Sequence, residues 1–402
     1  MSLALLIDLD DTLIGNNFDE FLPHYLESFS KTVEAIIEPE KFVHALLSST
    51  QAMFDNRQPD RTLQEAFESS FYPTLNLDEG KYQVAAERFY AEVFPTLREL
   101  TCQKPAAVRL IEYAQKRGYT IAIATNPLFP MTAISQRLSW ANLSPDKFKF
   151  QLISSYETFH FTKPAIDYFA EVMARLGWPE DSVIMIGDDL EKDILPARKL
   201  GLPTFWVNFD GNDLQNGFEI PFASGDLGDV LPWLQEITHQ DLLPDYSSPA
   251  AMLATLRATP AVLDTLCRHL PLELWKIRDR PDEWCLLEII CHLRDIDREV
   301  NKPRLQKVLN EIDPFIPGVD TDPWAQERGY YDQNGLKALQ QFIISRLAML
   351  DMLEAVKAEE WQRPARHAFL GRTALAELVH IVAQHDRLHI RQIHQSLDVV
   401  AK

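Results

Sequence analysis

The chain has 402 residues and carries 59 Asp and Glu against 39 Lys and Arg, which gives it a formal charge of −20 at pH 7. Hydrophobic residues make up 46% of the chain, enough to bury sizeable cores, so disorder of the whole chain is excluded. The length predicts about two to three domains. A chain this acidic repels phosphate backbones and anionic lipids, so we expect neither nucleic acid nor a membrane surface as a partner.

Cysteine usage predicts a reducing compartment. The four cysteines, Cys102, Cys267, Cys285 and Cys291, are too few for a disulfide scaffold and include no Cys-x-x-Cys pair. The apolar start at residues 3–7 runs directly into Asp8 and lacks the basic flank and the length of a signal peptide or membrane span. We therefore expect a soluble, cytoplasmic protein.

The first part of the chain contains short apolar runs bounded by acidic or turn residues, which predict buried parallel strands. Helical patterns lie between them, and two of these, at 106–117 and 164–176, stop at Gly118 and Gly177. Strands that alternate with helices predict a doubly wound α/β sheet. The expected strands are residues 3–7, 120–124, 150–153, 183–186 and 204–207.

A long insertion interrupts this alternation from about residue 17 to residue 100. Its pattern predicts amphipathic helices and no strand. We expect a helical cap inserted after the first strand, so that a domain of residues 1–238 has its core in 1–16 and 101–238. The expected cap helices are residues 18–35, 39–54, 63–71 and 79–94.

The sheet pattern ends near residue 234, and residues 239–249, with two Pro and two Ser, predict a linker. Residues 250–402 are expected to be helical, because apolar residues recur there at i, i+3 and i+4. Four such helices predict an all-α four-helix bundle. They are expected at residues 249–268, 283–309, 333–357 and 373–397.

Polar side chains follow several of the predicted strands. Open α/β sheets bind ligands at the carboxyl ends of their strands, so these residues are the first candidates for a site. They are Asp8 and Asp10 after the first strand, Thr125 and Asn126 after the second, and Asp188, Asp189 and Asp193 after the fourth.

Carboxylates that converge from several strands repel one another unless they share a cation. Mg²⁺ prefers oxygen ligands, and it would also neutralise a phosphate approaching this acidic chain. Lys163, which precedes Pro164 at the start of a predicted helix, adds a positive charge. The pattern therefore predicts a magnesium site that accepts an anionic substrate.

In this order, the motifs resemble those of the haloacid dehalogenase (HAD) superfamily over roughly residues 1–235. The matching residues are Asp8-Leu9-Asp10-Asp11-Thr12, Thr125, Lys163-Pro164, and Gly187-Asp188-Asp189 followed by Asp193. The resemblance implies a Rossmann-like core with a mobile helical cap of the kind that closes over small soluble substrates. Asp10 favours a phosphatase over a dehalogenase, because the dehalogenase branch does not keep this second acid.

The resemblance also implies a role for each matching residue. Asp8 would be the nucleophile that forms an aspartyl-phosphate, and Asp10 the general acid and then the general base. Thr125 and Asn126 would bind phosphoryl oxygens, and Lys163 would stabilise the developing charge. The magnesium ligands would be Asp8, the backbone carbonyl of Asp10 and Asp188, with Asp189 or Asp193 completing the shell.

A second cluster of candidate ligands lies in the predicted bundle. His385 and His389 are four residues apart on one helical face, and His292 lies on an earlier helix among apolar neighbours. Three imidazoles that project inward from two helices fit a divalent transition metal with an open position.

This part resembles the DinB-like family over about residues 250–400. Two features support this resemblance. One is a helix that begins at Trp284 and bears His292, and the other is the final run His385-Asp386-Arg387-Leu388-His389-Ile390-Arg391-Gln392. The resemblance implies Zn²⁺, Ni²⁺ or a similar ion on the three histidines, and in some members thiol-dependent transferase or isomerase activity.

The leading hypothesis is a Mg²⁺-dependent phosphatase that acts on a small phosphorylated metabolite and is fused to a metal-binding bundle. Two alternatives stay open for the bundle. It performs metal- and thiol-dependent transfer or isomerisation, or it is a docking or dimerisation module without catalysis, in which case a homodimer is a possible partner arrangement.

Overall fold

A computed structural model describes residues 3–77, 79–208, 222–268, 270–278, 280 and 283–400. The chain forms two compact units, one of Met1–Val172 with Pro179–Asp245 and one of Met173–Trp178 with Tyr246–Lys402.

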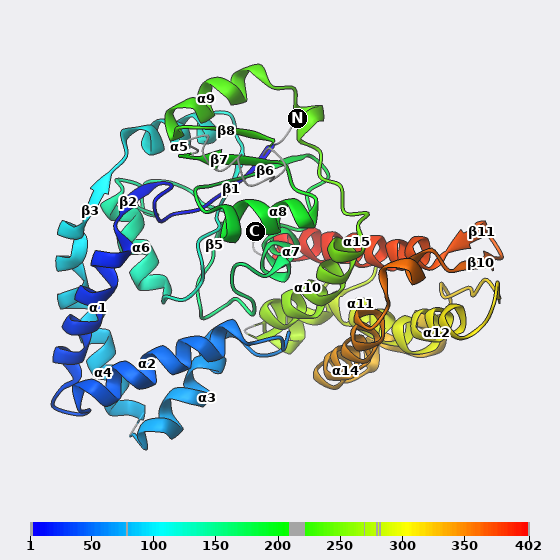
Figure 1. The fold of residues 1–402 in the computed structure, drawn as a ribbon. Helices are drawn as coiled ribbons and strands as arrows, with labels where there is room; N and C mark the ends of the chain where they lie inside the picture. The colour runs from blue at the N-terminus through cyan, green and yellow to red at the C-terminus, as the bar shows by residue number, and fades with distance from the viewer. Residues whose placement is uncertain are drawn as a thin grey trace. The chain divides into compact units, whose positions relative to one another are not determined.

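The first unit is built on a six-stranded parallel sheet (Figure 1) with the strand order β5-β4-β1-β6-β7-β8. The central strands β1 and β6 are buried along their whole length, as their unbroken apolar sequences predict. The doubly wound sheet is thus confirmed. The edge strand β5 is shorter than predicted, and the strand β8 was not predicted from the sequence. The strands are β1 Leu3–Ile7, β4 Thr120–Ile123, β5 Leu152–Ile153, β6 Ser182–Gly187, β7 Thr204–Val207 and β8 Ala223–Gly225.

The order of the strands determines where a ligand can bind. From β1 the chain moves to β4 and β5 on one side and later to β6, β7 and β8 on the other, so the direction of winding reverses beside β1. Ile7 pairs with both Ile123 and Ile186, so the three strands end at the same level. Helices α5 and α9 cover one face and α8 the other (Figure 1). The helices of this core are α5 Pro105–Lys116, α6 Met131–Trp140, α7 Ile166–Arg175, α8 Leu195–Leu200 and α9 Leu227–Glu236.

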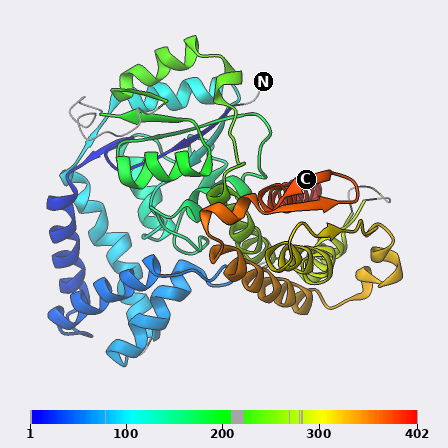
Figure 2. The same cartoon turned by 45° about the vertical axis from the view of Figure 1, so that its right-hand side comes forward.

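The insertion after β1 forms the expected helical cap, which Figure 2 shows in blue beside the sheet. Its core is aromatic, and the rings of Phe29 and Phe89 stack with centroids 4.1 Å apart. A short antiparallel pair of strands, β2 Ile14–Asn16 and β3 Thr101–Gln103, joins the two ends of the cap, although the sequence predicted no strand there. The cap consists of α1 Phe18–Val33, α2 Pro39–Phe54, α3 Leu63–Leu75, α4 Glu79–Arg88, a π-helical turn Phe89–Val93 and a 3₁₀ segment Phe94–Leu100.

The second unit is mostly helical, and its long helices pack against one another as a bundle. The expected helix at 283–309 begins instead at Leu286, because Cys285 is its N-cap, and it widens into a π-helical turn at Asp297–Asn301. The structure adds a small three-stranded sheet to the predicted helices. The helices are α10 Pro249–Arg268, α11 Leu286–Ile296, α12 Lys302–Asn310, α13 Trp324–Glu327, α14 Gly335–Glu354 and α15 Leu375–Val400, and the strands are β9 Phe315–Ile316, β10 Pro364–His367 and β11 Gly371–Ala374.

One buried cation connects four helical segments of this bundle. Arg346 on α14 is fully buried, and its Nε donates to Asp297 at 2.7 Å. The same guanidinium pairs with Asp386 on α15 and donates to the backbone carbonyl of Leu256 on α10 at 2.9 Å. Both carboxylates are also fully buried, so each depends on Arg346 for its compensating charge.

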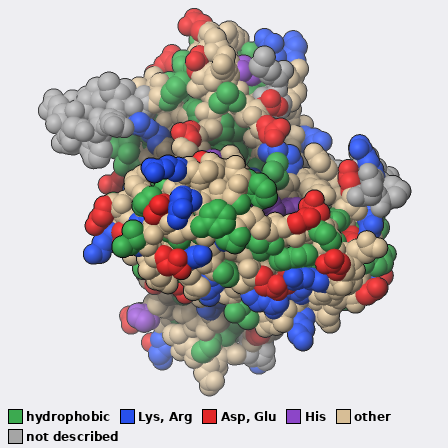
Figure 3. Space-filling model, turned by 90° about the vertical axis from the view of Figure 1, so that its right-hand side faces the viewer, with side chains coloured by type: hydrophobic (Ala, Val, Ile, Leu, Met, Phe, Trp, Pro, Cys, Tyr) green, Lys and Arg blue, Asp and Glu red, His purple; other side chains and the backbone are tan. Residues whose placement is uncertain are grey.

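The surface carries a mixture of side-chain types. Acidic, basic and apolar side chains are intermingled on the face drawn in Figure 3. Among the residues that the structure describes, no helix combines the length and the apolar character needed to cross a membrane.

Replacing Arg346 with Met should destabilise the bundle by about 3–5 kcal/mol, because two buried carboxylates would lose their partner. Urea unfolding followed by circular dichroism measures this change. Arg298→Met, at an exposed arginine in the π-helical turn, is the matched control and should cost less than about 1 kcal/mol. Equal effects of the two substitutions would contradict the role assigned to Arg346.

Candidate active site and metal centre

Three carboxylates meet at the carboxyl ends of β1 and β6. Asp8 follows β1, and Asp188 and Asp193 follow β6, and one carboxylate oxygen of each lies within 4.8 Å of the others. Asp8 and Asp193 are buried, with 7% and 2% of their surfaces exposed. The register of the sheet accounts for this convergence, because β1 and β6 are adjacent and end at the same level.

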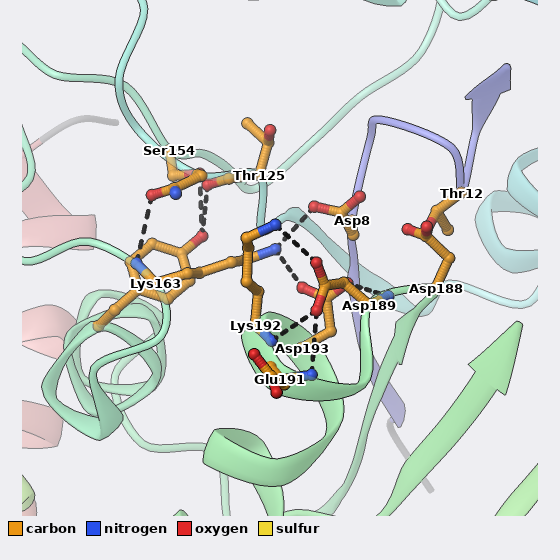
Figure 4. A network of polar contacts seen from close by, with 12 residues as sticks. Asp8, Thr12, Thr125, Ser154, Lys163, Asp188, Asp189, Glu191, Lys192 and Asp193 are labelled. Carbon is orange, nitrogen blue, oxygen red and sulfur yellow. Dashed lines mark hydrogen bonds and ion pairs between the residues drawn. The ribbon is translucent and has the colours of Figure 1, made fainter. Parts of the chain in front are cut away.

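Lys163 lies between two of these carboxylates (Figure 4). Its Nζ donates to Asp8 Oδ1 at 2.7 Å and to Asp193 Oδ1 at 2.5 Å. Burial alone would lower the pKa of Lys163, but Asp193 and Asp8 outweigh it and raise this pKa above its usual value. The ammonium therefore stays charged and offsets part of the negative charge of the cluster.

Two neighbours hold the other carboxylates in place. Thr12 donates its hydroxyl to Asp188 Oδ1 at 3.0 Å. A Cβ at Gly187 would lie 2.4 Å from Asp193 Oδ2, so only glycine leaves room for this carboxylate against the end of β6. Steric crowding therefore explains why the first residue of this Gly-Asp-Asp sequence is glycine.

The three carboxylates fit a hard divalent cation. Burial, and then the nearby charge of Asp8, raises the pKa of Asp188 to about 7, and burial likewise raises the pKa of Asp193. Burial and mutual repulsion thus both disfavour the charged carboxylates, and a bound cation would relieve both effects. Three carboxylate oxygens from two strand ends are the donor set that Mg²⁺ prefers.

Asp10 lies apart from this cluster and has a different partner. Its carboxylate pairs with the guanidinium of Arg137 on α6, which is 1% exposed and lies 4.6 Å from the ring centroid of Phe21 in the cap. Burial raises the pKa of Asp10 to about 6, although Arg137 opposes that rise. A carboxyl group with this pKa can hold a proton near neutral pH, as a general acid must.

Sequence reasoning did not select Arg137. The available signal was an arginine on the apolar face of a helix, between Ile134 and Leu138, both buried. Its partner Asp10 is 127 residues away in the chain, so no local pattern pairs the two.

The other predicted residues take different positions around the cluster. Thr125 is buried, and its backbone carbonyl accepts from Ser154 at 2.6 Å and from Tyr168 at 2.8 Å. Asn126 accepts from the backbone N–H of Lys163 at 3.2 Å. Asp189 accepts from the backbone N–H groups of the turn that follows it and pairs with Lys192, so the structure brings Asp193 rather than Asp189 to Asp8 and Asp188.

A cavity of about 1080 Å³ extends from these carboxylates toward the cap. Its floor includes Asp8, Asp10, Thr125, Lys163 and Asp188. Its walls include residues of α1, α2, α3 and α4. A small organic molecule can therefore enter with one end on the carboxylate cluster and the other between the cap helices.

The second candidate site lies in the bundle, where three imidazoles converge. His385 Nε2 lies 3.1 Å from His292 Nε2 and 3.1 Å from His389 Nε2. Three nitrogen ligands of a tetrahedral ion at about 2.0–2.1 Å would be about 3.3 Å apart, close to the observed spacing. The Nε2 atoms of the three predicted histidines therefore converge on one point.

The surroundings favour neutral imidazoles with free lone pairs. Burial, followed by the neighbouring rings, lowers the pKa of His292 to about 3 and that of His389 to about 4, and burial lowers that of His385 to about 4. Gln392 Oε1 lies 3.2 Å from His389 Nδ1, which orients that ring, and Trp284 stacks on it at 6.0 Å between centroids. The site fits a transition metal such as Zn²⁺ or Ni²⁺.

Glu288 and the three cysteines of this unit have structural roles. Glu288 accepts from the backbone N–H of Cys285 at 3.0 Å and pairs with Arg278, so it caps the start of α11. The thiols of Cys267, Cys285 and Cys291 are buried, and burial raises the pKa of each. They pack as core residues.

Family models match both parts of the chain. The model of the haloacid dehalogenase-like hydrolases matches residues 3–201, and that of the DinB superfamily matches residues 255–393. Residues 3–201 belong to the haloacid dehalogenase-like hydrolases, and residues 255–393 to the DinB superfamily. The HAD and DinB-like resemblances of the sequence are thus confirmed.

Several individual proteins are similar to this chain. The ribulose-1,5-bisphosphate 5-phosphatase of Halopiger xanaduensis is 34% identical over 115 residues, which is 29% of this chain and 45% of that protein. The chain therefore spans less than half the length of this curated relative. Among solved structures, a HAD phosphatase from Thermococcus onnurineus is similar at 21% identity and a TM-score of 0.37, covering 58% of this chain and 98% of that one. YfiT from Bacillus subtilis, a four-helix bundle of unusual topology, is similar at 15% identity and a TM-score of 0.36, covering 42% and 91%.

Asp193 and Asp189 make a matched pair for testing the magnesium site. Asp193→Asn should weaken Mg²⁺ binding by at least roughly tenfold, because it removes a charged oxygen from the cluster. Asp189→Asn should change it much less, since an Asn side chain still caps the turn. Isothermal titration measures the Mg²⁺ dissociation constant of each variant. A larger loss of affinity in Asp189→Asn would show that Asp189, and not Asp193, binds the ion.

His385→Ala should abolish transition-metal binding by the bundle. Elemental analysis of the purified wild-type protein should find about one ion per chain, and the variant should carry almost none. His380→Ala, on the same helix but outside the cluster, is the control and should keep its metal. Chelation should lower the melting temperature of the control but not that of His385→Ala, and equal metal contents would refute the site.

Proposed function

We propose that the first unit is a Mg²⁺-dependent phosphomonoester hydrolase that acts on small phosphorylated metabolites. The observation that carries this proposal is the joint placement of Asp8, Lys163, Asp188 and Asp193 at the base of a cavity that a helical cap covers. Dehalogenation does not need this acidic cluster or the protonatable Asp10. The match to the hydrolase family supports the same reaction class.

In the proposed first step, a carboxylate oxygen of Asp8 attacks phosphorus and the bond to the leaving oxygen breaks. Asp10 gives its proton to that oxygen, so the product leaves as an alcohol and Asp8 becomes an aspartyl-phosphate. Lys163 stabilises the charge on the transferring group, and Thr125 and Asn126 bind its oxygens. A Mg²⁺ ion held by Asp8, Asp188 and Asp193, with the backbone carbonyl of Asp10, would supply the positive charge that an anionic substrate needs in this acidic protein.

In the second step, Asp10 accepts a proton from water as the water attacks the aspartyl-phosphate. The acyl-phosphate bond breaks, inorganic phosphate leaves and Asp8 is restored as a carboxylate. Asp10 must turn from Arg137 toward the leaving oxygen to do this, and its pKa of about 6 suits both proton transfers. The cap would exclude bulk water, which favours small soluble substrates over protein-sized ones.

The proposal extends to the organisation of the chain. We assign residues 1–238 to the hydrolase domain, with its cap at about 17–100, then a linker at 239–249 and the bundle at 250–402. The four cysteines are all free thiols, which agrees with a reducing, cytoplasmic location.

The bundle supports a second candidate function, metal-dependent chemistry at His292, His385 and His389. Three protein ligands leave a tetrahedral ion with one position for water or substrate, and His385 and His389 are only partly buried. A thiol-dependent transferase or isomerase would use that position. A docking or dimerisation module would need only the structural stability that the ion supplies.

Variants of Asp8 and Asp10 separate the two chemical steps. Asp8→Asn should lower turnover of 4-nitrophenyl phosphate by at least roughly 10³-fold, because the nucleophile is lost. Asp10→Asn should release a burst of about one equivalent of nitrophenol and then stop, since a good leaving group needs no acid but hydrolysis needs the base. Stopped-flow absorbance measures the burst, and mass spectrometry of the quenched protein locates the phosphate.

The two variants should melt within a few degrees of the wild type, which separates loss of chemistry from loss of fold. Unchanged turnover in Asp8→Asn would refute the proposed function. Full steady-state activity in Asp10→Asn would refute its part in both steps.

A further inference from the structure

The cap side of the cavity is lined mainly by apolar side chains, and many of these are aromatic rings. They come from all four cap helices and the π-helical turn that follows them, and several of them contact one another as well as the cavity. Such a wall buries a flat or apolar group with little loss of side-chain freedom. The rings are Tyr25, Phe29, Phe54, Phe67, Tyr72, Tyr82 and Tyr90.

The charges in the lining are distributed unevenly. The basic residues among the described lining are Lys163 and Lys192, and both are already paired with carboxylates of the core. The cap contributes acids instead, Glu68 on α3 and Glu87 on α4. Apart from residues 1 and 2, the residues of this unit that the structure does not describe are 78 and 209–221. Their sequence contains neither Lys nor Arg.

Two polar side chains in the lining have buried atoms without a hydrogen-bond partner among the described residues. Asn16 is 4% exposed, and both its amide oxygen and its amide nitrogen are buried without a hydrogen bond. Gln136 donates its amide to the carbonyl of Tyr90, but its Oε1 is buried and unpaired. Buried polar groups without partners are uncommon, so these atoms are available to a ligand that brings its own donor and acceptor.

We propose that the substrate is a monophosphate whose leaving group is a flat ring without negative charge that carries hydrogen-bonding substituents. This inference rests on the proposed function, because it concerns the part of the substrate that lies between the cap helices while the phosphate lies on the carboxylate cluster. A second phosphate or a carboxylate on the leaving group would be buried beside Glu68 with no free cation among the described lining residues. Such burial of an unpaired anion is costly.

The same argument separates this chain from its curated relative. The name of that relative specifies a bisphosphate, whose leaving group keeps a second phosphate after the reaction. Recognition of phosphate calls for arginine, lysine or helix N-termini placed for that purpose. The described cap lining supplies acids and aromatic rings in their place.

The test compares two benzyl phosphates, one with a para carboxamide and one with a para carboxylate. The two esters have nearly the same shape, and the methylene keeps their leaving alcohols similar, so the comparison isolates the charge. With saturating Mg²⁺ and the full chain, kcat/KM for the carboxamide should exceed that for the carboxylate by at least roughly 100-fold. The cyclohexylmethyl ester tests the requirement for a flat ring and should be slower than the carboxamide.

Each outcome decides one of the two proposals. Equal turnover of carboxamide and carboxylate, or a preference for ribulose 1,5-bisphosphate over the carboxamide, would overturn the inference about the leaving group. Hydrolysis of 4-nitrophenyl phosphate without hydrolysis of either benzyl ester would overturn it as well. Failure with every ester, 4-nitrophenyl phosphate included, would instead refute the proposed function, and the inference with it.

A pair of variants tests the same point from the side of the protein. Glu68→Lys places an ammonium in the lining, and it should raise the kcat/KM of the carboxylate ester relative to the carboxamide by at least roughly tenfold. Glu68→Gln keeps the shape without the charge and should shift this ratio by less. A ratio that is the same in both variants would show that the charge of the cap lining does not select the substrate.

Discussion

The contact of Lys163 with both Asp8 and Asp193 is the interaction on which the first unit depends. It joins a carboxylate at the end of β1 to one beyond the end of β6, so it holds the two halves of the doubly wound sheet at their point of reversal. Without this ammonium, two buried carboxylates would face each other with no cation of the protein between them. The same charge therefore maintains the geometry of the site and offsets part of its negative charge.

The features that the sequence predicted are those that come from continuous local patterns. Short apolar runs such as Leu3–Ile7 predicted buried strands, and the doubly wound sheet with its helical cap is confirmed. The features it did not predict come from pairing over long distances. β8 and β9 have three and two residues, too few for a periodicity, and they become strands only because a partner lies beside them.

The candidate sites show the same division. Motif order led to Asp8, Asp188 and Asp193, and the structure brings these three together, while their catalytic roles stay predictions. The position of Asp189 at the start of a turn could not be read from the motif, because two adjacent aspartates differ only in the direction of their side chains. Arg137 was missed because an arginine on an apolar helix face has no sequence signature until its buried carboxylate partner is known.

The two candidate metal sites solve the problem of burying ligands in opposite ways. The carboxylate cluster keeps its negative charge with the help of Lys163, and the raised pKa values of Asp188 and Asp193 reflect burial first and the charge of Asp8 after it. The histidine cluster avoids charge, since burial holds its imidazoles neutral. A chain with a charge of −20 has no excess of cations to attract an anion from a distance. Its selectivity must therefore come from short-range contacts, with one end of the cavity able to accept a phosphate and the described cap lining better suited to a neutral ring.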